Sequence, residues 1–511
     1  MSAECKILNG ICRLLYHREY KKFTSACNIK KVQTEYLLKL LKKNSETVYG
    51  RKYGFQSIQN YEDFAKKVPL SVYEDYEPYI NAMANGETNV LTQEKITLFE
   101  LTSGSSGSKK MIPYTKTLKR EFQRGIKPWL YDIYSKVGGV DKGKSYWSIT
   151  PVTAGKSYTP SGIPVGFEED AEYFGFVTQG IMRRLFAVDG SVKFAEDMQD
   201  FYQKTAVQLL TCGELTLISV WNPTFLTLLC EFICNNKDSL AGQIPEEGRQ
   251  IFLEAAEEKR FDRIFPELKV ISCWADGSAS AYIDKVREYF SDVYIQPKGL
   301  LATECFMSFP LVGEEGARLS IYSHFFEFRR LTDGEIVTAD MLCVGEYELI
   351  VTTGGGFYRY CIGDIVEVLA VYPDAPPRIR FLHRTGTCSD LFGEKLTEEF
   401  VRSVCEKLGI AGCFCLLAPE GTCYCLYTTA EHVTSKRLDD ALRESYHYNY
   451  CRQLGQLQEA RSVTVTGDPQ KTYIERLAAE GMRVGDIKPA YLSPKSGWRE
   501  FFDLQEEKIT C

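Results

Sequence analysis

Small hydroxylated residues, glycines and lysines fill positions 102–110, which read Thr-Ser-Gly-Ser-Ser-Gly-Ser-Lys-Lys. Glycines let a backbone approach a phosphate closely, and successive N–H groups, hydroxyls and lysines are the donors that a phosphate needs. The segment is not a Walker A loop, because its glycines and lysines lack the G-x-x-x-x-G-K-[ST] spacing. Taken alone, it is compatible with a phosphate site or with a plain linker.

Two acidic residues lie where a nucleotide enzyme could use them. Glu304 ends the sequence Ala302-Thr303-Glu304, just after an apolar, strand-like stretch. A carboxylate at the carboxyl end of a strand can hold Mg²⁺ through one oxygen while phosphates supply others. Asp364 follows Gly363, and such an Asp can accept hydrogen bonds from ribose hydroxyls. A solvated loop acid and an Asx turn are the alternative interpretations.

Basic residues gather near position 388, where we expect a domain boundary. Arg384 is followed by Asp390-Leu391-Phe392-Gly393-Glu394-Lys395-Leu396. Basic groups at a hinge can meet a phosphate or a ribose, and the alternative is a surface linker with ordinary charge pairs. Because 511 residues exceed what one core can hold, we predict two domains, residues 1–387 and residues 388–511.

The elements that must position these residues alternate between strand and helix. Residues 215–235 and 270–290 each read as a strand, a turn and a helix, which predicts an α/β fold with mainly parallel sheets. Residues 347–386 are rich in strands and turns, so a β-barrel-like subdomain is expected there. After residue 388, amphipathic helices flank a hairpin, and the second of them is expected over residues 432–454. This pattern predicts a small mobile α+β domain.

The composition of the chain limits which classes of binding partner are expected. The net charge of −7 argues against a nucleic-acid partner, and no apolar run reaches the ~18 residues that would span a membrane. The N-terminal residues alternate apolar and basic types too quickly for a secretory signal, so we expect a cytoplasmic protein with reduced cysteines. Two C-x-C pairs near residues 413–425 match no common zinc spacing and are expected to pack on one face of a hairpin.

In order and rough spacing, these four segments resemble the adenylate-forming superfamily, which includes acyl-CoA synthetases, nonribosomal peptide adenylation domains and firefly luciferase. More specifically, the chain resembles the Gretchen Hagen, or auxin-responsive promoter, family of acyl-acid amido synthetases. The stretches that carry this likeness are ISVWNPTFL (218–226), FFEF (325–328) and YELIVTTGGGFYRYCIGDIVEV (347–368).

The resemblance implies ATP and Mg²⁺ as cofactors and assigns a role to each matching residue. Nucleotide binding would fall to Ser103, Gly104, Ser105, Ser106, Gly107, Lys110, Ala302, Thr303, Tyr358, Asp364 and Arg384. Glu304 would ligate Mg²⁺, and Thr303, Lys395 and Lys488 would be catalytic. The tail around Lys488 lacks the arginine of the family's G-x-x-K-x-P-R-like pattern, which leaves Lys495 as the alternative lysine.

The implied reaction is ATP-dependent activation of a carboxylic acid as an acyl-adenylate, followed by transfer of the acyl group to the amine of an amino acid. A ligase that uses coenzyme A or a carrier thiol as acceptor shares the first half-reaction and is the alternative. A binding protein that has kept the fold without catalysis is a third hypothesis. Neither a nucleic acid nor a membrane is an expected partner.

Overall fold

The computed structural model describes residues 2–103, 109–148, 157–166, 176–276, 282–384, 388–479 and 490–504. The chain divides into two compact units. The larger comprises Met1–Thr102 and Met111–His383, and the smaller comprises Ser103–Lys110 and Arg384–Cys511. A large N-terminal unit and a smaller C-terminal unit agree with the predicted fold class, whereas the exact limits 1–387 and 388–511 stay a prediction.

A four-stranded parallel sheet with the order β3-β6-β7-β8 is central to the larger unit. Its strands are β3 (Lys144–Trp147), β6 (Leu215–Ser219), β7 (Val270–Cys273) and β8 (Tyr294–Pro297). Every residue of β6 and β7 is buried, as expected for strands covered on both faces. This sheet confirms the prediction of parallel strands that alternate with helices.

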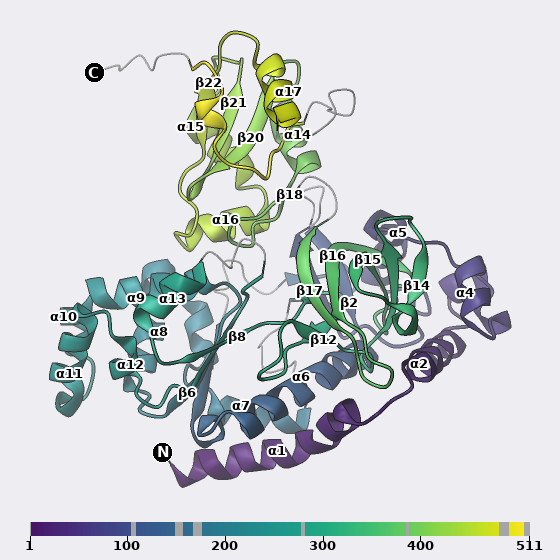
Figure 1. The fold of residues 1–511 in the computed structure, drawn as a ribbon, viewed down its shortest axis with the longest axis horizontal. Coiled ribbons are helices and arrows are strands. Elements are labelled where there is room, and N and C mark those ends of the chain that lie inside the picture. Colours follow the sequence, from purple (N-terminus) through teal and green to yellow (C-terminus); the bar gives the residue numbers. More distant parts are fainter. Residues whose placement is uncertain are drawn as a thin grey trace. The chain divides into compact units, whose positions relative to one another are not determined.

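Among the helices that belong to this sheet, α9 begins with an identifiable signal. Asn222 caps α9 by accepting a hydrogen bond from the Thr224 N–H, and Pro223 occupies the first helical position. Figure 1 shows these helices gathered around β6 and β8. They are α7 (Phe176–Leu185), α8 (Met198–Thr211), α9 (Pro223–Asn235), α10 (Lys237–Ala241), α11 (Glu246–Glu257), α12 (Phe261–Ile264) and α13 (Ile283–Tyr289).

The strand-rich region forms a seven-stranded sheet with the order β11-β12-β17-β16-β15-β13-β14, built on antiparallel pairs. Its strands are β11 (Ser308–Phe309), β12 (Ala317–Leu319), β13 (Phe325–Arg330), β14 (Ile336–Thr338), β15 (Gly345–Thr352), β16 (Tyr360–Ala370) and β17 (Arg378–Arg384). A short hairpin, β9 (Leu301–Ala302) and β10 (Cys305–Phe306), joins the two sheets along the chain.

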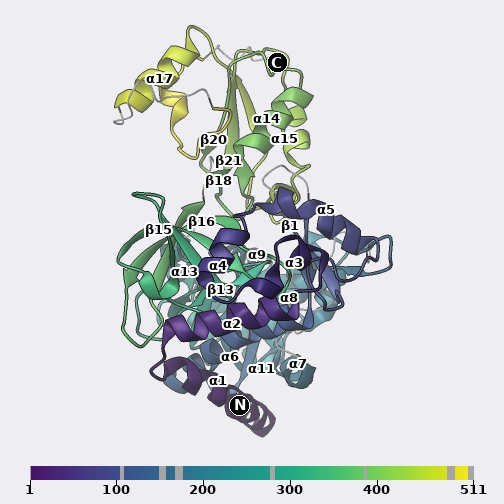
Figure 2. The same ribbon diagram turned by 90° about the vertical axis from the view of Figure 1, so that its right-hand side faces the viewer.

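The N-terminal segment is helical, and α1 packs against the long helix α6 (Figures 1 and 2). The helices are α1 (Ala3–Thr24), α2 (Ile29–Lys43), α3 (Val48–Lys52), α4 (Tyr61–Lys67), α5 (Tyr73–Ala84) and α6 (Lys116–Lys136). A further sheet has the order β2-β1-β5-β4, with strands β1 (Leu98–Ser103), β2 (Lys109–Tyr114), β4 (Ser157–Tyr158) and β5 (Pro164–Val165).

The smaller unit is α+β, as predicted. Its sheet has the order β20-β21-β22, and Figure 2 shows α14 and α15 on one side of it and α17 on the other. The elements are β18 (Cys388–Ser389), β19 (Leu396–Thr397), α14 (Glu398–Lys407), β20 (Cys415–Glu420), β21 (Cys423–Thr428), α15 (Ser435–Leu442), α16 (Tyr446–Gln453), β22 (Arg461–Thr464) and α17 (Pro469–Ala479).

One helix prediction was wrong in this unit. Residues 432–454 were expected to form a single helix, but α15 ends at Leu442 and α16 begins at Tyr446. Ser445 caps the second helix by accepting a hydrogen bond from the Tyr448 N–H, which restarts the helical ladder.

Among the described residues, no helix is both long and apolar enough to cross a membrane.

Candidate functional site

Thr303 and Glu304 form the two-residue turn of the β9–β10 hairpin. Ala302 pairs with Cys305 directly below them, so the three residues of the predicted motif lie together at one hairpin tip. This hairpin follows β8, the edge strand of the parallel sheet, and therefore continues from the carboxyl end of that sheet. Ligands of open α/β sheets bind at this edge, which supports a functional role for the turn.

The hairpin is held from two sides by hydrogen bonds. The Tyr114 hydroxyl donates to the Thr303 carbonyl at 2.7 Å. On the other strand, the Phe306 N–H donates to Nε2 of the fully buried His324 at 2.9 Å. These anchors fix the backbone of the turn, so the Glu304 side chain starts from a defined position.

The Glu304 carboxylate is only 4% exposed and lies among tyrosines. The Tyr360 hydroxyl donates to its Oε1 at 3.4 Å. Burial, with smaller contributions from carboxylates that include Glu304, raises the pKa of Tyr73 to about 12. Among the described residues, this carboxylate receives one long hydrogen bond, from a neutral donor. A cation would supply the positive charge that this contact lacks, so the site suits a cation.

Asp364 lies on β16, the strand that begins with Tyr360. The pairing of β16 with β15 shifts register between Glu348 and Ile350, and Gly363 has a φ of +82° on the facing stretch. A bulge of this kind turns the next side chain out of the regular alternation, and a glycine adopts such a φ without strain. Gly363 therefore sets the direction of Asp364, which is 7% exposed.

Tyr358, predicted as a nucleotide-binding residue, has a different environment. Its side chain is fully buried, and its hydroxyl accepts a hydrogen bond from Asn44 Nδ2 at 2.8 Å and donates to the Leu91 carbonyl at 2.9 Å. Its ring also stacks on Tyr49 with centroids 5.2 Å apart. The geometry argues for packing by this side chain, while Tyr360, which the sequence analysis missed, contacts Glu304.

Several predicted residues lie at the ends of described strands or outside them. Ser103 ends β1, Lys110 lies in β2, and Arg384 ends β17, next to β16 in the sheet. Gly104, Ser105, Ser106, Gly107 and Lys488 lie outside the described residues. Their roles stay predictions.

In the smaller unit, Lys395 follows a tightly bonded turn. The buried Glu394 carboxylate accepts hydrogen bonds from the N–H groups of Leu391 and Phe392 and from the Tyr424 hydroxyl. Burial, reinforced by the charge of Asp390, raises the pKa of Glu394 to about 7. Lys395 itself is exposed and has a φ of +46°, a strained conformation for a residue with a side chain. The predicted hinge lysine is thus presented by a rigid turn.

Lys298 is a second feature that the sequence analysis missed. It directly follows β8, is 8% exposed, and donates a hydrogen bond from Nζ to Ser219 Oγ at 2.8 Å. Three tryptophan rings surround Nζ, with ring centroids at 5.0 Å for Trp129, 5.8 Å for Trp147 and 5.1 Å for Trp221. We call Lys298 and these three rings the lysine box.

The buried lysine of the lysine box should make the stability of the protein depend on pH. Burial lowers the pKa of Lys298 from 10.5 to about 7, so between these values the unfolded chain carries a proton that the folded chain lacks. Relative to Lys298→Met, the free energy of unfolding of the wild type should therefore rise between pH 7 and pH 10.5, by at most about 1.4 kcal/mol per pH unit. Urea unfolding of both proteins at several pH values checks this, and a constant difference would contradict it.

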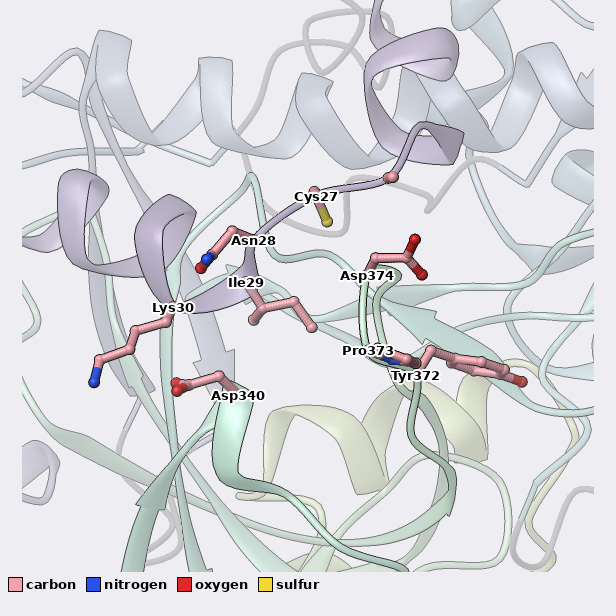
Figure 3. A pocket seen from close by; sticks show the side chains of 9 residues that line it. Cys27, Asn28, Ile29, Lys30, Asp340, Tyr372, Pro373 and Asp374 are labelled. Atoms are coloured by element: carbon pink, nitrogen blue, oxygen red, sulfur yellow. The ribbon is translucent and has the colours of Figure 1, made fainter.

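A separate surface hollow of about 520 Å³ lies between the α1–α2 connection and the β16–β17 connection (Figure 3). Lys30 and Asp340 lie on one side of it, and Tyr372 and Asp374 on the other. None of the predicted site residues lines it. The hollow therefore has no part in the candidate site.

Comparison with known proteins identifies the family of this chain. The GH3 family N-terminal domain matches residues 18–249, and the GH3 family central domain matches residues 318–384, together more than half of the chain. The chain belongs to the GH3 family. The central-domain match includes Tyr360 and Asp364, while the Thr303–Glu304 turn lies between the two matches.

Two curated family members from Arabidopsis thaliana indicate the breadth of the likeness. Indole-3-acetic acid-amido synthetase GH3.3 is 23% identical over 454 residues, covering 79% of this chain and 74% of that protein. The 4-substituted benzoates-glutamate ligase GH3.12 is 25% identical over 433 residues, covering 75% and 73%. The solved GH3.15 acyl acid amido synthetase in complex with 2,4-DB has a TM-score of 0.65 at 18% identity, covers 97% of this chain and 98% of its own, and so shares the fold.

Proposed function

We propose that this GH3 protein uses ATP to convert a carboxylic acid into an acyl-adenylate and then transfers the acyl group to the amine of an amino acid. The relatives named above are amido synthetases and a ligase of 4-substituted benzoates and glutamate. The observation that carries the proposal is the anchored Thr303–Glu304 turn, whose buried carboxylate contacts the strand that bears Asp364.

The residues at this turn fit a magnesium nucleotide. Mg²⁺ is commonly bound through one or two carboxylates together with substrate phosphates, and Glu304 offers one buried carboxylate. When bound, the ion supplies charge neutralisation at the phosphates. Asp364 would accept hydrogen bonds from the ribose, and the Ser103–Lys110 segment with Arg384 would donate to phosphate oxygens. These contacts would position the α-phosphate for attack by the carboxylate, which is the main catalytic demand of this step.

The second half-reaction requires the acceptor to reach the acyl carbon after pyrophosphate leaves. A lysine on a separate, mobile domain can act during one half-reaction and then move away from the site for the other. We assign Lys395 to this movement, because its rigid turn follows directly after β18 at the start of the smaller unit. Lys488 would stabilise the charge that develops at the phosphate during adenylation.

The decisive experiment is ATP–pyrophosphate exchange with a panel of carboxylic acids. Exchange that depends on the acid supports adenylation, and its absence with every acid would overturn the proposal. Supplying amino acids or coenzyme A to the formed adenylate then separates amide from thioester formation. A product with coenzyme A and none with any amino acid would favour the alternative ligase.

Asp364→Asn should act mainly on nucleotide binding. The amide keeps the size of the carboxylate but cannot accept two charge-assisted hydrogen bonds, so the KM for ATP should rise about 10- to 100-fold. The exchange assay at varied ATP concentrations measures this. An unchanged KM for ATP would remove Asp364 from the site.

We further propose a cytoplasmic location. Every cysteine that the structure describes is a free thiol, as expected for a protein of a reducing compartment. The cysteines of the predicted C-x-C pairs that lie in β20 and β21 are buried in the hairpin.

A further inference from the structure

The lysine box occupies the carboxyl edge of the parallel sheet, where this kind of sheet binds ligands. Lys298 follows β8, but its ammonium bonds to Ser219 at the end of β6, two strands away. Adjacent strands lie ~4.8 Å apart, so the lysine carries its charge on the order of 10 Å across the sheet. Thr303 and Glu304 instead continue from β8 into the hairpin. The Lys298 ammonium therefore lies at a different part of the sheet's carboxyl edge from the part that leads to the hairpin tip.

The groups beside this ammonium are hydrogen-bond donors. Ser219, Ser272 and Gln296 occupy one register row across β6, β7 and β8, so their side chains share one face. Ser219 accepts from Lys298, which leaves its own proton to donate. Among the described residues, Ser272 Oγ and Gln296 Nε2 are buried without a hydrogen-bond partner. Buried polar atoms are rarely left in this state unless something else satisfies them.

The walls of the box are aromatic, and one of them reaches solvent. Trp129 is buried, and its Nε1 donates to Gln296 Oε1 at 2.9 Å. Trp221 is 51% exposed while its ring lies over Nζ, so the ammonium lies just beneath the surface at this wall. In its protonated form, Lys298 is one cation among neutral donors and flat rings, and this arrangement matches an anionic group attached to a planar body. A triphosphate would need more positive charge than a single lysine provides.

We propose that the lysine box binds an anionic group of the acid substrate, so that the enzyme selects flat acids with a second acidic group far from the carboxylate that reacts. This inference rests on the proposed function and specifies its substrate class. The second acidic group pairs with Lys298, and the planar body of the acid lies against the tryptophan rings. The reacting carboxylate at the other end is then directed toward the Thr303–Glu304 turn.

The test compares two flat acids, benzene-1,4-dicarboxylate and 4-methylbenzoate, which share a benzoate body and differ in whether the para group is anionic or neutral. In acid-dependent pyrophosphate exchange, the wild type should prefer the dicarboxylate by about 100-fold in kcat/KM. Lys298→Met keeps the length of the side chain without its charge and should reverse this preference. Lys269→Met, which removes a half-buried lysine next to the amino end of β7, should leave the preference unchanged.

Binding without ATP provides a second readout. The dicarboxylate should raise the melting temperature of the wild type and of Lys269→Met, but not that of Lys298→Met. Equal use of both acids by the wild type, an unchanged ratio in Lys298→Met, or a loss confined to the KM for ATP would overturn the inference while leaving adenylation intact. Selective binding of the dicarboxylate with no exchange for any acid would instead support the lysine box and refute the proposed function.

Discussion

Glu304→Gln should reduce acid-dependent pyrophosphate exchange about 1000-fold, close to the loss expected when a principal electrostatic contact of a transition state is removed. The amide keeps the volume of the side chain and can still accept the hydrogen bond from Tyr360. It cannot supply the negative charge that would hold Mg²⁺ at the phosphates. The exchange rate at saturating ATP, acid and magnesium measures the effect.

Two controls separate this loss from damage to the fold. Glu335→Gln makes the same chemical change at an exposed carboxylate beside β14 that pairs with Arg330, and should leave exchange within about twofold of the wild type. Urea unfolding of Glu304→Gln should show a stability close to that of the wild type, because the substitution buries a neutral group in place of a charge. Full exchange in Glu304→Gln would place the metal elsewhere.

The sequence was sufficient for those parts of the site that depend on local order along the chain. A strand followed by Thr303 and Glu304 already placed a carboxylate at a strand end, and the hairpin confirms that position. The start of α9, with Asn222 as its cap and Pro223 in its first turn, likewise depends on local chemistry alone. Such signals act over a few residues and need no knowledge of how the sheets are ordered.

The lysine box could not be predicted in this way. Lys298, Ser219 and Trp129 are separated by about 80 residues or more, and they meet only because β8 lies two strands from β6 and α6 crosses the same face. The available local signal was a lysine at the end of an apolar strand. Without the lateral order of the strands, that signal is equally compatible with a solvated loop lysine.

The different environments of Tyr358 and Tyr360 could not be predicted for another reason. Arg359, between them, has a φ of +52°, which interrupts the simple alternation of side chains along the chain. The turn therefore directs Tyr358 into the core and brings Tyr360 to Glu304. A positive φ at a residue other than glycine has no dependable sequence signal, because tertiary contacts impose it.

Those contacts form a buried ion pair. The Arg359 guanidinium, 6% exposed, donates from Nε to both carboxylate oxygens of Glu327 at 3.0 and 3.1 Å, and Nη1 donates to the carbonyls of Ala65 and Val68. The Tyr61 hydroxyl also donates to Glu327, so the pair joins α4 to β13. Burial raises the pKa of Glu327, and Arg359 opposes that shift.

Arg359→Met should therefore destabilise the protein by about 3–5 kcal/mol, because it leaves the Glu327 charge buried without its partner. The Glu327 pKa should rise further in the variant, so the folded state retains a proton that the unfolded chain releases. The loss of stability should then be smaller at pH 5 than at pH 8. Urea unfolding at both pH values measures the difference.

The matched comparison is Arg330→Met, which removes the arginine that ends β13 and pairs with Asp333 and Glu335 in a largely exposed cluster. It should cost less than about 1 kcal/mol, with little dependence on pH over this range. The double variant Arg359→Met with Glu327→Met should recover part of the loss, because no buried charge then remains unpaired. An equal cost for the two arginines would show that the ion pair does not hold the turn. In that case the strained backbone at Arg359, and with it the approach of Tyr360 to Glu304, would have to be maintained by the surrounding core alone.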